Sequence, residues 1–218
     1  MINTTILSLS AVFLTKSPFS IVHLTSINSF YVDKSLFSKS FQSVFYFNIN
    51  QGNVLFSNTL FKNILDCAIL SDFKGKIINQ RFSPYVNSSR YYTFESCLFQ
   101  NCISNKYNGS AICITVPKNS NFDVDISFEF SSFYKCRTQN GFGGAIYLYH
   151  FGDVSILETC FLECYASESS SDNNVEGSTV YINHRTSTER TRLRACSINS
   201  CPSDPLLCHK CDSIFRIF

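Results

Sequence analysis

Two glutamates are the carboxylates whose spacing best suggests shared chemistry. Glu95 and Glu129 stand at equivalent places in two similar segments, 94–102 and 128–136. On neighbouring parallel strands the two side chains would lie about 5 Å apart on one face. A stacked carboxylate pair can bind calcium or a sugar, and paired carboxylates carry out glycoside hydrolysis. The alternative is a solvated surface pair, as we expect for the ion pair between Lys135 and Glu163.

Other candidates for catalysis or cofactor binding are weaker. The histidines share no repeat-equivalent position and show no evident carboxylate or serine partner: His23, His150, His184 and His209. The stretch 141–144 (Gly-Phe-Gly-Gly) lacks the Gly-Lys-Ser/Thr ending of a phosphate-binding loop, and no helix follows it. The sequence therefore predicts no catalytic residue, no cofactor and no enzyme.

Four cysteines near the C-terminus are the candidate metal ligands. Cys208 and Cys211 have the Cys-x-x-Cys spacing of zinc ligands, whereas the spacing of Cys196 and Cys201 recurs in segment 94–102. The repeat therefore explains the second pair. Cys208 and Cys211 alone form a weak zinc candidate, and a local disulfide or free thiols are the alternatives.

The elements that would position these residues are internal repeats. The clearest copies span 94–201 and begin with segments 94–102, 128–136, 156–164 and 193–201. Gly-Ser/Gly-Ala-Ile strands follow the first two copies at identical spacing, and the third copy reaches a similar strand after six extra residues. Tandem copies of this length predict stacked supersecondary units.

The repeat predicts an all-β parallel solenoid with coils of about 24 residues. Short runs rich in Phe, Tyr, Ile and Val alternate with polar residues and end in Ser, Asn and Gly clusters. An antiparallel sandwich is the alternative. Stacked coils would align an aromatic ladder of Phe13, Phe37, Phe61, Phe99, Phe133 and Phe161. They would also align a cysteine ladder of Cys102, Cys136, Cys164 and Cys201.

The strand 143–146 (Gly-Gly-Ala-Ile), paired with Phe-x-x-Cys, resembles the repeat of polymorphic outer membrane proteins. In that family Gly-Gly-Ala-(Ile/Leu/Val) pairs with Phe-x-x-Asn, so the cysteines here depart from the bacterial pattern. Cysteine-bearing versions occur in predicted β-helix surface proteins of parasitic protists. The resemblance implies a right-handed β-helix of the pectin lyase-like kind and a role in surface display or adhesion. It implies no catalytic residues.

Composition agrees with one domain over 1–218, which we expect to be part of a longer chain. The net charge is +2, and the densest basic stretch, 185–194, is interrupted by Glu189, so we expect no nucleic-acid partner. No apolar run is long enough to predict a membrane span.

The cysteine content leaves the compartment open. The chain has 11 cysteines, which either pair in an oxidising compartment or stay reduced as small buried hydrophobes. Asn-x-Ser/Thr glycosylation motifs occur at Asn3, Asn87 and Asn108, which suits a secreted chain.

Insertions at two turns of each coil suggest loops that bind, because loops on a rigid scaffold carry function. We expect a non-enzymatic, extracellular or cell-surface module that adheres to host or cell-surface glycans or proteins. A carbohydrate-active β-helix enzyme, lyase-like or hydrolase-like, is one alternative. A purely structural solenoid spacer is the other.

Overall fold

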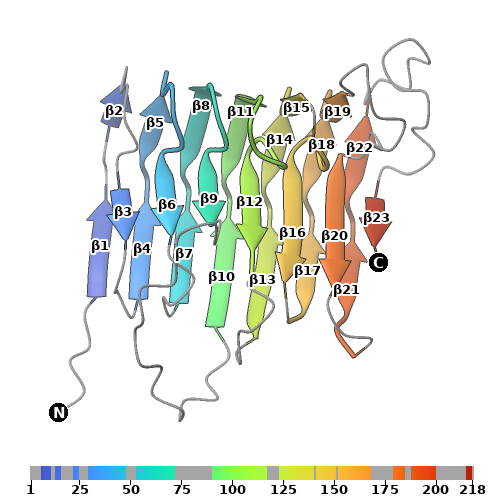
Figure 1. The fold of residues 1–218 in the computed structure, drawn as a ribbon. Coiled ribbons are helices and arrows are strands. Elements are labelled where there is room, and N and C mark those ends of the chain that lie inside the picture. Colours follow the sequence, from blue (N-terminus) through green and yellow to red (C-terminus); the bar gives the residue numbers. More distant parts are fainter. Residues whose placement is uncertain are drawn as a thin grey trace, which may run out of the picture.

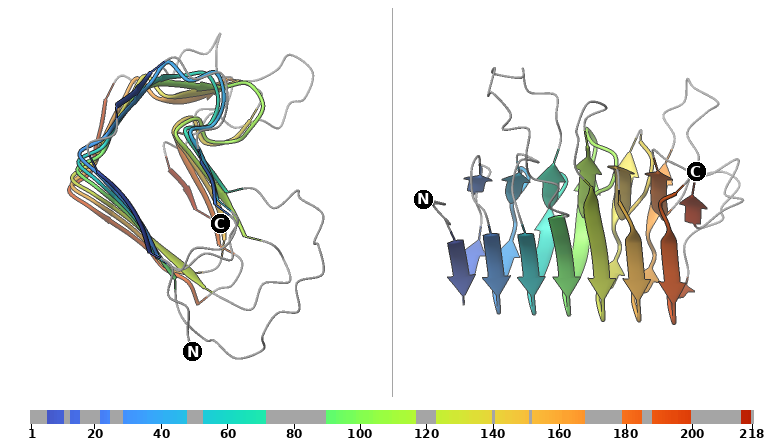
Figure 2. Two further views of the ribbon diagram at one scale, coloured as in Figure 1. Left: turned by 90° about the vertical axis from the view of Figure 1, so that its left-hand side faces the viewer. Right: turned by 90° about the horizontal axis from the view of Figure 1, so that it is seen from below.

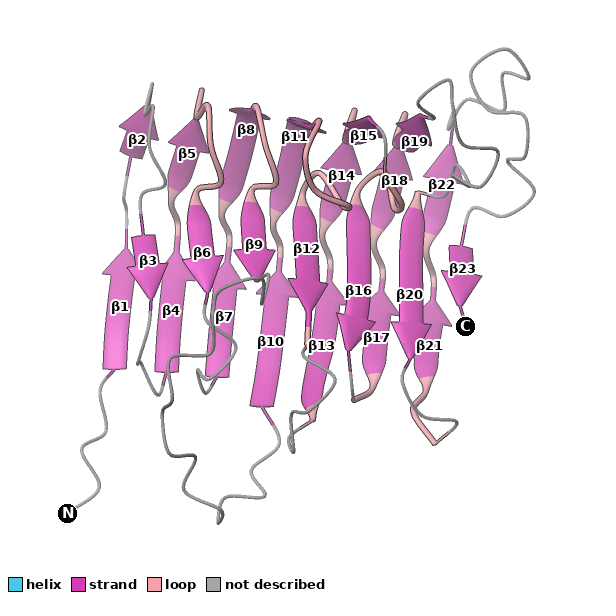
Figure 3. Ribbon diagram, in the orientation of Figure 1, coloured by secondary structure: helices cyan, strands magenta, loops and turns pink. Residues whose placement is uncertain are grey.

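The described part of the computed structural model consists of β-strands and their connections, without a helix (Figure 3). It describes residues 6–10, 13–15, 22–24, 29–47, 53–71, 90–116, 123–139, 141–150, 152–167, 179–184, 188–199 and 215–217. Every pairing between these strands is parallel. The predicted all-β, parallel class is therefore confirmed, and the antiparallel sandwich is wrong.

The strands form three sheets, here called A, B and C (Figure 1). Sheet A contains β1 (Ile6–Ser10), β4 (Ser29–Asp33), β7 (Asn53–Ser57), β10 (Arg90–Glu95), β13 (Val124–Glu129), β17 (Val154–Leu157) and β21 (Thr191–Arg194). Sheet B contains β2 (Phe13–Thr15), β5 (Leu36–Ser38), β8 (Leu60–Ile64), β11 (Leu98–Ser104), β14 (Ser132–Tyr134), β18 (Cys160–Leu162) and β22 (Ser197–Asn199), with β15 (Arg137–Gln139) and β19 (Tyr165–Ser167) beside it. Sheet C contains β3 (Val22–Leu24), β6 (Phe45–Phe47), β9 (Ile69–Ser71), β12 (Ile112–Thr115), β16 (Ile146–His150), β20 (Val180–His184) and β23 (Phe215–Ile217).

The chain visits sheets A, B and C in turn, and we call one such passage a circuit. Each strand pairs with its equivalent in the next circuit, so the sheets run side by side along one axis (Figure 2). This topology is compatible with a parallel β-helix. The circuits differ in length: Ser29 pairs with Asn53, whereas Val54 pairs with Tyr92.

Phenylalanines from sheets A and B fill the interior between the sheets. Phe61, Phe99 and Phe133 are at most 1% exposed, and their rings stack with centroids 4.8 and 4.9 Å apart. Phe37 and Phe161 extend this row at its two ends. A second stacked row, which is not among the predicted ladders, comes from Phe56, Phe94 and Phe128 in sheet A. Each buried ring contributes about 1.5–3 kcal/mol, and a stacked pair adds about 1 kcal/mol.

Phe13 was wrongly assigned to the aromatic ladder. It pairs with Leu36, and its neighbour Leu14 pairs with Phe37. The first circuit is one residue shorter than the second, because sheet A aligns Leu7 with Phe30. The predicted ladder assumed an offset of 24 residues between Phe13 and Phe37. With that offset, β2 would move by one position, and its inward and outward side chains would be exchanged.

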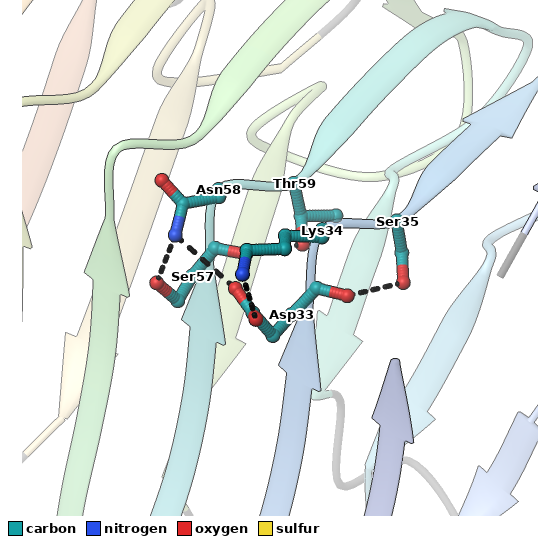
Figure 4. A network of polar contacts seen from close by, with 6 residues as sticks. All are labelled: Asp33, Lys34, Ser35, Ser57, Asn58 and Thr59. Carbon is teal, nitrogen blue, oxygen red and sulfur yellow. Dashed lines mark hydrogen bonds and ion pairs between the residues drawn. The ribbon is translucent and has the colours of Figure 1, made fainter. Parts of the chain in front are cut away.

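The corners between sheets A and B share one backbone feature wherever they are described. One residue adopts a positive φ, as Lys34 (φ 46) and Asn58 (φ 48) do. A buried serine or threonine follows it in four circuits, and a cysteine follows it in two, at Cys97 and Cys196. Ser35 and Thr59 illustrate the pattern, since each hydroxyl donates to the carbonyl two residues earlier at 2.8 Å (Figure 4). The Ser57 carbonyl also accepts the Lys34 N–H of the neighbouring circuit at 3.2 Å, so the Thr59 hydroxyl adds a second hydrogen bond that fixes the turn.

A second residue with positive φ lies five positions further on. The two sets are Lys34, Asn58, Ser96, Phe130, Glu158 and Ala195 at the first corner, and Lys39, Asn63, Asn101, Lys135 and Glu163 at the second. Outside glycine, asparagine and aspartate tolerate this conformation best, so the stacked circuits must impose it on the other residue types.

Within the described residues, no helix is long and apolar enough to cross a membrane.

Candidate binding groove

A groove of about 770 Å³ lies along the second corner, where sheet B bends toward β15 and β19. We call it the corner groove. Its lining residues come from four successive circuits: Asn63, Leu65, Asn101, Ile103, Lys135, Arg137, Glu163 and Tyr165. It is the larger of the two concave surfaces described here.

Two rows of side chains form the corner groove. The first row consists of the positive-φ residues Asn63, Asn101, Lys135 and Glu163, with φ of 53–54°. The second row lies two residues further along each circuit and contains Leu65, Ile103, Arg137 and Tyr165. Parallel pairing aligns Ile103 with Arg137, and Arg137 with Tyr165. Residues at equivalent positions therefore follow one another every ~4.8 Å along the groove, which is the spacing of neighbouring strands.

The first row is paired within itself. The Asn101 amide nitrogen donates to the Asn63 amide oxygen at 3.0 Å. The predicted pair is present, with 3.5 Å between the Lys135 Nζ and a Glu163 carboxylate oxygen. A hydrogen bond to Tyr134 and the charge of Glu163 raise the pKa of Lys135. Both side chains of this ion pair are more than 40% exposed, so it adds little stability.

The second row contains the residue that is free to act on a ligand. The Arg137 guanidinium has no ion pair or hydrogen bond with any residue that the structure describes, and Arg137 is half-buried. Ile103 and Tyr165 flank it in the same row.

Between the two rows, the cysteine ladder points inward. Cys102, Cys136 and Cys164 are completely buried, and the last two donate to Phe99 and Phe133 carbonyls at 3.5 and 3.3 Å. Burial raises the pKa of the Cys136 and Cys164 thiols well above the ordinary value. The described cysteines are all free thiols: Cys67, Cys97, Cys102, Cys113, Cys136, Cys160, Cys164 and Cys196. Cys201 and the zinc candidates Cys208 and Cys211 lie outside the described residues.

Gly144 allows the backbone of Tyr165, which lines the corner groove, to lie close to the Gly-Gly-Ala-Ile strand. A methyl group at this position would collide with the backbone of Tyr165. The Gly-Gly-Ala-Ile strand therefore needs glycine here because β19 passes directly against it.

Glu95 and Glu129 align in register on sheet A, as their spacing predicts. The Ser127 hydroxyl donates to a Glu129 carboxylate oxygen at 2.8 Å. Neither glutamate lines the corner groove. Across the described ranges, no group of three or more His, Cys, Asp or Glu side chains is arranged to hold a metal ion.

The prediction for the histidines is wrong at two of them. His150 and His184 occupy paired positions in sheet C. His184 also has partners, because its Nε2 lies 2.6 Å from the Thr191 hydroxyl and its Nδ1 lies 3.3 Å from a Glu189 carboxylate oxygen. His184 lies at the end of sheet C, and its partners Glu189 and Thr191 lie at the start of the next circuit. No local sequence motif predicts these contacts.

Asn108 is used by the fold. Its Oδ1 accepts the Phe142 N–H at 2.9 Å, and its side chain hydrogen-bonds Tyr147. The hydroxyl of Ser110, the third residue of the motif, is buried and donates to the Gly144 carbonyl at 2.6 Å. A glycan on Asn108 would have to disturb these contacts. Asn3 and Asn87 lie outside the described residues.

A second concavity, of about 160 Å³, lies on the outer face of sheet A, and we call it the sheet hollow. Its polar and aromatic lining residues are Tyr91, Thr93, Asp125, Ser127, Asp153, Ser155 and Arg192. Asp125 accepts the Asp153 N–H at 2.9 Å, and Asp153 accepts the Arg190 N–H at 2.8 Å. These carboxylates therefore stabilise the backbone of the next circuit.

Comparisons with protein-family models, with curated proteins and with solved structures returned no match.

Proposed function

We propose that the chain is a right-handed parallel β-helix module, with a basic coil of about 24 residues lengthened by loop insertions. The 24-residue offset between Ser29 and Asn53 supports the basic coil. Parallel crossover connections are overwhelmingly right-handed, which supports the handedness. The resemblance of the strand 143–146 to polymorphic outer membrane protein repeats implies the same handedness.

As its function, we propose non-enzymatic binding of an extended glycan by a surface or secreted protein, with adhesion as the outcome. The corner groove carries this proposal. It crosses four circuits, and each circuit adds one residue to each row at the spacing of the strands. A polymer of similar units could contact each circuit in turn.

The strands beside the groove favour a glycan over a polypeptide. Strand β11 pairs with β8 and β14, and β15 pairs with β11 and β19, so their backbone groups are used in ladders. A peptide therefore cannot add to β11 or β15 through main-chain hydrogen bonds, whereas β19 pairs with β15 alone among the described strands. Recognition depends on side-chain amides, charges and the Tyr165 ring, a combination suited to hydroxyl-bearing rings.

A glycan-binding screen with matched tyrosine variants tests this function. The full chain would be applied to immobilised hyaluronan, chondroitin, dextran, cellohexaose and chitohexaose. We expect at least one ligand to bind, and Tyr165→Ala to weaken its binding at least tenfold. Tyr91→Ala is the control, because Tyr91 is 52% exposed in the sheet hollow.

Two results would contradict the proposal. One is the absence of binding to every glycan, which is what a structural spacer predicts. The other is equal loss in the Tyr165 and Tyr91 variants, which would place the ligand outside the corner groove. Surface labelling of the native cells tests the location separately, and exclusively intracellular protein would remove adhesion as the outcome.

A further inference from the structure

We propose that the glycan bound in the corner groove is acidic, and that Arg137 recognises one of its carboxylates. This inference rests on the proposed glycan-binding function. It adds a ligand class and a specificity-determining residue to that function.

The first argument is the charge of the groove. Its charged lining residues are Lys135, Arg137 and Glu163. Lys135 and Glu163 neutralise each other at 3.5 Å. Arg137 therefore gives the groove its net positive charge, and no acidic side chain within the described residues neutralises it.

The second argument is the state of the Arg137 side chain. Arg137 is half-buried and lies between Ile103 and Tyr165 in the row. A guanidinium offers paired N–H donors that match the two oxygens of a carboxylate. A ligand carboxylate would give this cation the partner that the described part of the fold does not.

The third argument is the arrangement around Arg137. Tyr165, one circuit further on, offers an aromatic ring to a neighbouring sugar. In the opposite direction, Asn63 and Asn101 use one donor and one acceptor on each other and keep further amide groups for hydroxyls. One cation and neutral neighbours fit a glycan with carboxylates on some of its units.

Calorimetric titration with two matched oligosaccharides tests the inference. The probes are a hyaluronan octasaccharide and the same octasaccharide with its carboxyl groups reduced to alcohols. We expect the acidic form to bind at least tenfold more tightly. We expect Arg137→Gln to remove that difference and to leave the affinity for the reduced form within twofold.

Two further variants separate charge, geometry and general effects. Arg137→Lys keeps the charge without the paired donors, so we expect it to recover only part of the preference. Arg194→Gln removes an exposed arginine that lines neither concavity, and we expect no change. The thermal unfolding midpoint of each variant shows whether it is folded.

The outcomes separate the two proposals. If both octasaccharides bind equally and Arg137→Gln has no effect, the acidic ligand is wrong but the glycan groove survives. If neither octasaccharide binds and the glycan screen is also negative, both are wrong. A third probe, sulfated dextran, distinguishes the anions: tighter binding to sulfated dextran than to hyaluronan would overturn recognition of a carboxylate.

Discussion

The corner groove and the sheet hollow are both concave and polar, but they use their polar side chains differently. In the sheet hollow, Asp125 and Asp153 accept backbone N–H groups of the following circuit. In the corner groove, Arg137 has no partner among the described residues. A polar concavity becomes a plausible binding site only where the fold leaves some of its donors, acceptors or charges unused.

The two surfaces also differ in charge. Asp123 lies near the sheet hollow, where burial and the charges of Glu189, Asp125 and Asp153 raise its pKa. The hollow is lined by Asp125 and Asp153 against one cation, Arg192, so its net charge is negative and an acidic glycan would be repelled there. The corner groove has the opposite sign because of Arg137.

Replacement of Gly144 by alanine should give the largest effect. The added methyl group would push against the Tyr165 backbone, and we expect a loss of about 3 kcal/mol in the free energy of unfolding. Binding in the corner groove should also fall, because its wall moves. Denaturant unfolding and glycan titration measure the two effects.

Ser155→Ala in the sheet hollow is the control, and it should change stability by less than about 0.5 kcal/mol. If Gly144→Ala were as stable as the natural chain, the close approach of β19 to this strand would be wrong.

Alkaline pH should give the second-largest effect, a loss of folding stability caused by the buried thiols at the second corner. Burial raises the pKa of the Cys136 and Cys164 thiols, so the folded state keeps protons that the unfolded state loses. Their contribution is complete below the unfolded thiol pKa of about 8.5 and falls above it. The two thiols together should cost about 2 kcal/mol of stability per pH unit there.

Unfolding free energies at pH 7.5, 8.5 and 9.5 would measure this slope. The double variant Cys136→Ala/Cys164→Ala should be less stable at pH 7.5 but should show a shallower slope. Equal slopes in the two proteins would mean that other groups cause the alkaline loss.

Replacement of Asp153 by alanine should give the smallest effect and should separate the two surfaces. It removes the acceptor of the Arg190 N–H, which should cost about 1 kcal/mol. Asp153→Asn keeps an acceptor oxygen and should cost less. Glycan affinity in the corner groove should stay within twofold in both, and a larger loss would show that the sheet hollow takes part in binding.

The ladders could be predicted from the sequence because residues of one type recur at equivalent positions. Phe99 and Phe133 stack as their spacing predicts, and Glu95 and Glu129 align. Phe13 shows the limit of this reasoning. The first circuit is one residue shorter than the second, so Phe13 pairs with Leu36 and not with Phe37, although both positions hold phenylalanine.

The corner groove could not be predicted in the same way. Its rows mix residue types, so Leu65 and Tyr165 show no similarity that an alignment of repeats could detect. The positive-φ residues that bend the chain are equally varied, and a bulky residue such as Phe130 (φ 50) gives no local sign of its conformation. The regularity appears only in the structure, as the constant five-residue spacing between the two positive-φ residues of each circuit.

The constant geometry of the corners has a consequence for how the number of circuits can change in evolution. Two residues always separate the sheet A strand from the sheet B strand that follows it, as between Asp33 and Leu36 or Glu129 and Ser132, whatever the length of the rest of the circuit. The two corners therefore act as a modular unit that can be copied or deleted with little change to its neighbours. Each added copy would extend both rows of the groove by one residue, so gene duplication alone could adjust the number of ligand units that one molecule holds.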